Sequence, residues 1–377
     1  MKVTIFLLVL LFTMVCQANS ERFIVKSKII DENPTVQVSL PDTYSHSDSY
    51  QYPLLLVLDG STQFSHIAAS TQFLSTYAII PEMIVVSVST QKRMTYFTPT
   101  AHEKFVGRSG KADLFKGYLQ KELIPYISNK YRVAPYYAVT GHSLGGLFTS
   151  NLVLDNNSKF GLHISISPSL WWEKSILVNN YKALSDNHLS SPKRWFLSIA
   201  SESGEMFESY TAMINALNEQ PLSKLHWFSE HFPEETHDST PLIGNARALK
   251  KIFNNWNAVP EIDVMPLHKL HDFYLKKIPE YGYHFTLSAH QYNVYGLKAA
   301  YEGKHQWGIE ILEQGVKEFG KSEILWDSLA TAYKLNKQLV KALHASNTAL
   351  KLAKTSNSIY LSDIISQNEH LNTVSNF

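Results

Sequence analysis

Ser143 lies at the centre of a Gly-X-Ser-X-Gly motif, in which residues 141–146 read Gly-His-Ser-Leu-Gly-Gly. The motif follows an apolar run at residues 136–140 and precedes a helix-forming segment. A strand, a tight turn and a helix in this order expose a serine at the edge of a sheet, and the flanking glycines avoid clashes in the turn. The N–H of Leu144 can then face a developing oxyanion. The motif predicts a nucleophilic serine, and the alternative is a glycine-rich turn with an incidental serine.

A nucleophilic serine needs a general base, because its hydroxyl is essentially un-ionised at neutral pH. The chain has 16 histidines, so a histidine carries weight only through its position. His237 lies between the last predicted strand and a helix expected near Thr240. Where a serine nucleophile lies in a strand–turn–helix motif of this kind, the base is expected in that loop. His231 is the nearest alternative, but it falls within the predicted strand. We therefore predict His237 as the base.

The third member of such a triad is an acid that orients the histidine and stabilises its imidazolium form. It should follow the strand before last, which we place at residues 194–200. The next residues include Glu202 and Glu205. We favour Glu202, because it lies closer to the end of the strand, and Glu205 stays open. For either residue the alternative is a solvated carboxylate at the start of a helix.

A second oxyanion donor should come from the loop after the third strand, at residues 58–62. Gly60 would permit close backbone approach to a ligand, so the N–H of Gly60 or of Ser61 is the candidate. The alternative interpretation is a simple Asp-Gly turn.

The elements that must position these residues alternate between short apolar runs and longer helical stretches. This pattern predicts an α/β protein with a mostly parallel sheet flanked by helices over residues 21–258. Several runs are almost continuously apolar, as expected for strands that are buried on both faces. The predicted strands span residues 23–29, 35–40, 53–58, 83–89, 136–140, 163–167, 194–200 and 225–232.

Residues 259–377 lack strand signals and show a helical repeat of about 34 residues. Small residues recur at equivalent positions, with Gly296 matching Ala330 and Gly308 matching Ala342. Such spacing lets paired helices approach closely and resembles tetratricopeptide repeats. We expect a small all-α domain that caps the hydrolase or offers a surface for a protein partner.

Residues 1–20 resemble a signal peptide, with Lys2 before an apolar run at residues 5–15 and small residues at the cleavage positions. Cys16 raises a lipoprotein alternative, which Val15 disfavours because the residue before a lipidated cysteine is usually small. Since Cys16 is the only cysteine, the mature chain would have no disulfide and no thiolate metal site. We predict an exported protein, periplasmic or secreted, without a membrane span after cleavage.

The charge balance excludes a strongly basic or acidic protein, because 34 Lys and Arg residues face 33 Asp and Glu residues. This balance argues against nucleic acid as the main partner. No HExxH or similar close ligand set occurs, so no metal or other cofactor is expected.

The chain resembles the putative esterase (esterase D-like) family of α/β-hydrolases, and within it the enterochelin-esterase-like branch, including members that carry C-terminal tetratricopeptide-like repeats. The resemblance rests on the serine motif and on three further blocks, at residues 52–60, 122–127 and 167–172. The stretch after Gln91 departs from the pattern, with Tyr96 where relatives often have Asp.

The resemblance implies that Ser143 and His237 are catalytic and that Trp171 or Trp172 lies near the site, although tandem tryptophans often serve as core bulk. We expect the substrate pocket to include His142 and Arg93 as well. The predicted activity is hydrolysis of carboxylic esters through an acyl-enzyme. A siderophore trilactone is the most specific substrate prediction. The alternatives are an acyltransferase on the same fold and a repeat-based binding protein that uses the hydrolase as a platform.

Overall fold

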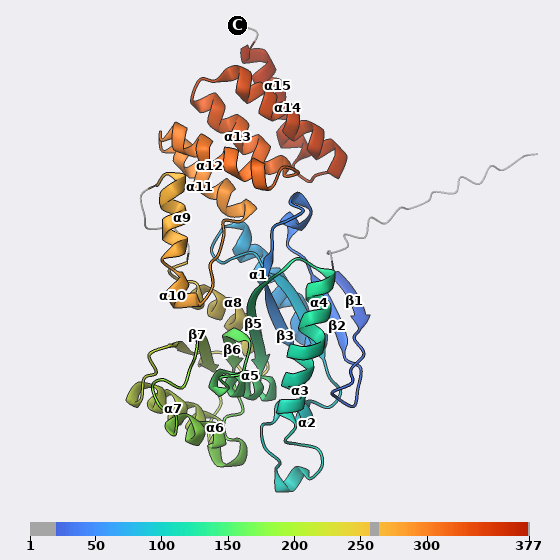
Figure 1. The fold of residues 1–377 in the computed structure, drawn as a ribbon, viewed down its shortest axis with the longest axis vertical. Helices are drawn as coiled ribbons and strands as arrows, with labels where there is room; N and C mark the ends of the chain where they lie inside the picture. Colours follow the sequence, from blue (N-terminus) through green and yellow to red (C-terminus); the bar gives the residue numbers. More distant parts are fainter. Residues whose placement is uncertain (1–19, 257–263, 376–377) are drawn as a thin grey trace, which may run out of the picture.

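The computed structural model describes residues 20–256 and 264–375 (Figure 1). The predicted signal peptide lies outside these residues, except for Ser20, and so does the predicted domain boundary near residue 258. The described chain forms an eight-stranded sheet with the order β1-β2-β4-β3-β5-β6-β7-β8. Strands β3 to β8 are parallel, whereas β1 and β2 add an antiparallel edge. The predicted α/β-hydrolase architecture is confirmed.

Each predicted run overlaps an observed strand, but β1 lies closer to the N-terminus than predicted, and β5 and β6 each begin three residues earlier. The strand predicted at residues 23–29 is β1 at Ser20–Ile24, because the chain bends at residues 28–32 to turn back into β2. The remaining strands are β2 (Thr35–Ser39), β3 (Tyr52–Leu58), β4 (Ile84–Ser89), β5 (Val133–His142), β6 (Phe160–Ile166), β7 (Lys193–Ile199) and β8 (Leu225–His231).

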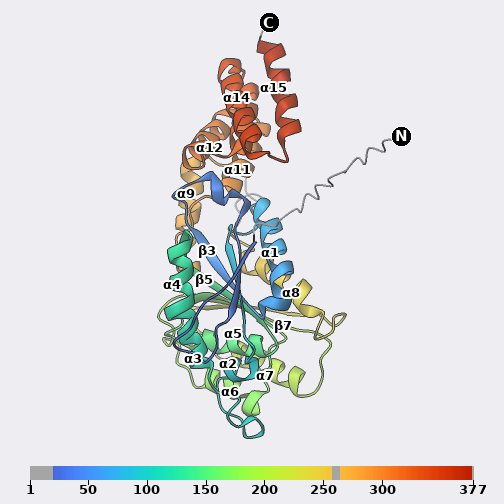
Figure 2. The ribbon, with the colours of Figure 1, turned by 90° about the vertical axis from the view of Figure 1, so that its right-hand side faces the viewer.

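Helices cover both faces of the sheet, and Figure 2 shows them on opposite sides. Helices α1 (Gly60–Thr76) and α8 (Thr240–Ile252) pack on one face. Helices α3 (Ala112–Tyr118), α4 (Ile124–Lys130) and α5 (Leu144–Leu154) pack on the other. The central strand β3 is buried along its whole length, as its uninterrupted apolar sequence predicts.

The C-terminal region is entirely helical in the part that the structure describes. The glycines of the predicted repeat lie where two helices meet, since a Cβ on Gly296 would approach Leu312 Cγ to 2.4 Å and one on Gly308 would approach the Gly296 carbonyl oxygen to 2.7 Å. The tetratricopeptide-like assignment stays a prediction. The helices are α9 (Leu267–Leu275), α10 (Ile278–Tyr281), α11 (Ala289–Tyr301), α12 (His305–Glu318), α13 (Glu323–Leu335), α14 (Leu339–Ser356) and α15 (Leu361–Ser375).

This helical region packs against the end of the sheet where the parallel strands begin (Figure 1). Tyr136, near the start of β5, contacts the Tyr283 and Phe285 rings with centroids 5.5 and 5.1 Å apart. Arg194, at the start of β7, forms an ion pair with Glu280 in α10. One apolar core therefore runs from the sheet into the helices. No helix in the described part of the chain is long and apolar enough to span a membrane.

Candidate active site

Ser143 occupies the tight turn between β5 and α5, with a backbone φ of 58°. Its N–H donates to the Ile166 carbonyl at 3.0 Å, which ties the turn to the neighbouring strand. The turn is closely packed, because a Cβ on Gly141 would approach the Gly145 carbonyl oxygen to 2.4 Å. Only glycine fits at position 141, and the strained backbone holds the serine side chain at the carboxyl edge of the sheet.

His237 follows β8, and its Nδ1 lies 2.7 Å from Glu202 Oε1. Glu202 follows β7, and its second oxygen accepts the Ala200 N–H at 2.6 Å. Burial raises the pKa of Glu202, but hydrogen bonds from His237, Ser167 and the backbone outweigh it and lower that pKa to about 2. The carboxylate therefore stays ionised and can hold the imidazole in one orientation.

The two alternatives considered for these positions lie elsewhere. Glu205 is exposed at the first residue of α7 (Glu205–Glu219). His231 ends β8, and its Nε2 contacts the Ala200 carbonyl at 3.1 Å. Neither side chain lines the pocket that contains Ser143.

A pocket of about 480 Å³ brings the serine and the histidine together. The Ser143 hydroxyl contacts the Ser169 hydroxyl at 3.4 Å, and within residues 20–256 no hydrogen bond joins it to His237. Catalytic hydrogen bonds are often long or unformed without substrate and tighten when it binds. The pocket is lined by Asp59, Ser61, Thr62, Gln63, Arg93, His142, Ser143, His237 and Asp238.

His142 packs directly against the base, with the His142 and His237 ring centroids 4.4 Å apart. Burial, reinforced by the nearby His237, lowers the pKa of His142 to about 4. His142 is therefore neutral at physiological pH, so it places no fixed positive charge beside the catalytic imidazole.

Two helix N-termini meet at this pocket. Leu144 is the first residue of α5, so its N–H has no acceptor within the helix. Ser61 is the second residue of α1 and lines the pocket, which makes its N–H the better placed of the two predicted second donors. Gly60 is buried away from the pocket wall, where a Cβ would approach Ser87 Oγ to 2.4 Å. The close packing against Ser87 therefore explains why residue 60 is a glycine.

Arg93 lines the pocket that contains Ser143, together with Asp59, which is not among the site residues predicted from the sequence. The Arg93 guanidinium binds the Asp59 carboxylate at 2.6 and 2.9 Å and also donates to the His142 carbonyl at 3.3 Å. Burial raises the pKa of Asp59, and the Arg93 charge opposes that shift. The sequence signal for Asp59 is a carboxylate directly after a buried strand. The interpretation of this stretch as a simple Asp-Gly turn assigns no role to that carboxylate.

The tandem tryptophans do not line the pocket. Trp172 is completely buried, and its Nε1 donates to Thr100 Oγ1 at 3.1 Å. Trp171 is partly buried against Trp172, outside the pocket wall. The expectation that Trp172 belongs to the substrate pocket is wrong, because its indole ring packs in the core as the first residue of α6 (Trp172–Lys182).

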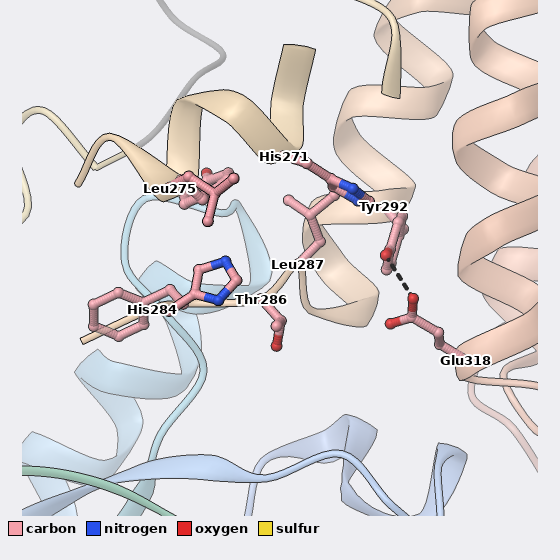
Figure 3. Close-up of a pocket in the computed structure, with 9 residues that line it drawn as sticks. His271, Leu275, His284, Thr286, Leu287, Tyr292 and Glu318 are labelled. Atoms are coloured by element: carbon pink, nitrogen blue, oxygen red, sulfur yellow. Dashed lines mark hydrogen bonds between the residues drawn. The ribbon is translucent and has the colours of Figure 1, made fainter. Parts of the chain in front are cut away.

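A second hollow, of about 290 Å³, lies in the helical region (Figure 3). Its wall includes His271, His284 and Glu318, and Glu318 accepts a hydrogen bond from Tyr292 at 3.0 Å. It contains no serine, so it offers no nucleophile of the kind found at residue 143.

The family model described as "Putative esterase" matches residues 27–234. The chain belongs to this esterase family. It is a serine ester hydrolase, and the match includes the nucleophile motif and Glu202, whereas His237 follows just after it.

Among curated relatives of this esterase, the ferri-bacillibactin esterase BesA of Bacillus subtilis is 23% identical in an alignment of 250 positions that covers 58% of this chain and 85% of BesA. The siderophore triacetylfusarinine C esterase of Aspergillus fumigatus is 22% identical in an alignment of 277 positions that covers 63% of this chain and 94% of that protein. The crystal structure of an IroE-like serine hydrolase from Shewanella oneidensis has a TM-score of 0.66 and 23% identity, covering 85% of this chain and 99% of that one. The last comparison shows that the fold is shared.

Proposed function

We propose that the protein hydrolyses carboxylic esters in two steps at Ser143. In the first step His237 takes the hydroxyl proton as Ser143 Oγ attacks the ester carbonyl carbon, and Glu202 stabilises the imidazolium through Nδ1. The N–H groups of Leu144 and Ser61 donate to the negatively charged oxygen of the tetrahedral intermediate. When this intermediate collapses, the imidazolium returns its proton to the leaving alkoxide, and an acyl-serine remains.

In the second step water replaces the alcohol. His237 removes a proton from water as the water oxygen attacks the acyl-serine carbonyl, and the proton then passes to Ser143 Oγ as the acid leaves. The observation that carries this proposal is the 2.7 Å contact between Glu202 and His237 in the pocket that Ser143 lines. A histidine held by an ionised carboxylate has the orientation and tautomer that a serine nucleophile requires.

We propose siderophore-type trilactone esters as the substrate class. One relative is named a ferri-bacillibactin esterase and another a siderophore triacetylfusarinine C esterase, and these names support the proposal. We also propose that the chain is exported, since the predicted signal peptide precedes the hydrolase. An exported esterase would meet a siderophore outside the cytoplasm.

The test uses the full mature chain with a catechol-bearing cyclic tri-serine lactone, and chromatography follows the opening of its ester bonds. Wild-type protein should convert the trilactone to linear acids, and Ser143→Ala should not. Cleavage of short p-nitrophenyl esters with the trilactone left intact would reject the substrate class and keep the esterase. Equal trilactone turnover by Ser143→Ala would reject the mechanism.

A further inference from the structure

A hollow of about 660 Å³ adjoins the catalytic pocket, and Arg93 forms part of both walls. We call it the basic hollow. It lies where β4 ends, between α2 (Arg93–Phe97) and the loop before α3. This is the edge of the sheet that also carries Ser143. The charged side chains that line the basic hollow are Lys92, Arg93, Arg108, Lys111 and Asp31.

Two of these basic side chains already have carboxylate partners. Lys92 Nζ lies 2.8 Å from Asp31 Oδ2, and Arg93 is held by Asp59. Arg108 and Lys111 are exposed, and neither forms an ion pair with a carboxylate in the described ranges. At longer range the Lys111 charge also helps to lower the pKa of Asp31, so Lys92 and Lys111 share this one carboxylate. The basic hollow therefore keeps an excess of positive charge, which attracts an anionic ligand.

The loop that carries Arg108 and Lys111 is tied to the α2 segment at its C-terminal end. The Lys111 N–H donates to the Thr95 carbonyl in α2 at 2.9 Å, and the Gly110 N–H donates to Thr98 Oγ1 at 2.8 Å. Gly110 has φ +84°, and a Cβ there would approach the Ala101 nitrogen to 2.4 Å. Because the loop backbone is held, the points from which both side chains extend are set before a ligand arrives, which lowers the entropic cost of binding.

We propose that the basic hollow is an anion subsite that binds a negatively charged part of the substrate while the scissile ester lies at Ser143. This inference rests on the proposed ester hydrolysis and sharpens its substrate class to esters that carry anionic groups. A ferric tris-catecholate trilactone belongs to this class, because three dianionic catecholates outweigh the charge of one Fe³⁺. Arg108 and Lys111 supply the matching positive charge.

The test compares two esters with the same leaving group, neutral p-nitrophenyl acetate and anionic mono-p-nitrophenyl succinate, on the full mature chain. The variant is Arg108→Gln/Lys111→Gln, and the charge-matched control is Lys334→Gln/Lys351→Gln in the helical region at the other end of the sheet. We expect the double variant to lower kcat/KM for the anionic ester by about tenfold through KM, the size expected for two exposed ion pairs. The neutral ester and the control variant should be unaffected, and added salt should shrink the difference.

The outcomes separate this inference from the function on which it rests. An unchanged ratio of anionic to neutral kcat/KM in the Arg108→Gln/Lys111→Gln variant overturns the anion subsite, while turnover of the neutral ester keeps the esterase. Equal losses on both esters also overturn it, because an anion subsite must discriminate. If wild-type protein cleaves neither ester nor the trilactone, the proposed function itself fails.

Discussion

Glu202 Oε1 lies 2.7 Å from His237 Nδ1, although the two residues are 35 positions apart in the chain. The contact joins the loops after β7 and β8, which are adjacent parallel strands. Since the pKa of Glu202 is lowered to about 2, this carboxylate stays ionised across the pH range in which an esterase works.

The first prediction follows from this contact. Glu202→Gln should lower kcat by a factor on the order of 10²–10⁴, because the imidazole loses its orientation and the stabilisation of its charged form. Glu205→Gln is the matched control, since Glu205 is exposed at the start of α7. Steady-state kinetics with p-nitrophenyl acetate measure both variants. A large loss in Glu205→Gln with little change in Glu202→Gln would reverse the assignment.

The second prediction concerns the nucleophile. Ser143→Ala should lower kcat by about 10⁴-fold or more, because the members of a triad act as a unit. The fold should survive, because the replacement removes a single hydroxyl group at the edge of the sheet and keeps the glycines of the turn. A fluorophosphonate probe should label wild-type protein and not the variant, whereas Ser169→Ala should still be labelled. Retention of a tenth of wild-type activity in Ser143→Ala would place the nucleophile elsewhere.

The third prediction concerns pH-dependent stability. The folded-state pKa of His142 is about 4, below its ordinary value of 6.5, so the unfolded chain takes up this proton first as the pH falls. The stability that neutral His142 contributes is complete above pH 6.5 and is lost as the pH falls toward 4. Urea denaturation at pH 7 and pH 5 should show a smaller drop in the free energy of unfolding for His142→Gln than for wild type. An identical drop in both proteins would show that His142 titrates normally.

The fourth prediction concerns the joint between the sheet and the helical region. Arg194 is 1% exposed, pairs with Glu280, and lies over the Tyr281 ring at 4.4 Å. Arg194→Met should destabilise the fold by roughly 1–3 kcal/mol, because the buried Ile252 carbonyl loses its guanidinium donor, while Lys277 and Asn255 still contact Glu280. Thermal unfolding measures the change, and Arg247→Met serves as a control because the Arg247–Glu230 pair is more exposed. A loss below that of the control would mean that the joint contributes little to stability.

The fifth prediction concerns truncation after Trp256. This fragment keeps Ser143, Glu202 and His237, yet it removes the rings that pack on Tyr136 and Trp256. The exposed apolar surface should make the fragment aggregate, since large uncovered apolar patches promote association. Light scattering and solubility after expression test this outcome. A soluble, active monomer would show that the helical region is an independent module.

The sequence alone determined the local parts of the site. The motif around Ser143 needs only a buried strand, two glycines and a following helix, all contiguous in the chain, so its backbone geometry is a short-range property. The strand pattern is also a short-range property, because the spacing of apolar residues along the chain indicates where strands form and which of their faces are buried. His237 was placed by chain order alone, since the loop after the last strand of this fold opens at the catalytic edge.

Tertiary structure decided whatever depended on side chains meeting across loops. Glu202 and Glu205 lie three residues apart, and only the path of the loop after β7 turns one toward His237 and the other to solvent. Packing between distant segments also places Trp172 in the core. It likewise places the helical region against the end of the sheet where the parallel strands begin. These choices are set by which surfaces exclude water together, and no single stretch of sequence carries that information.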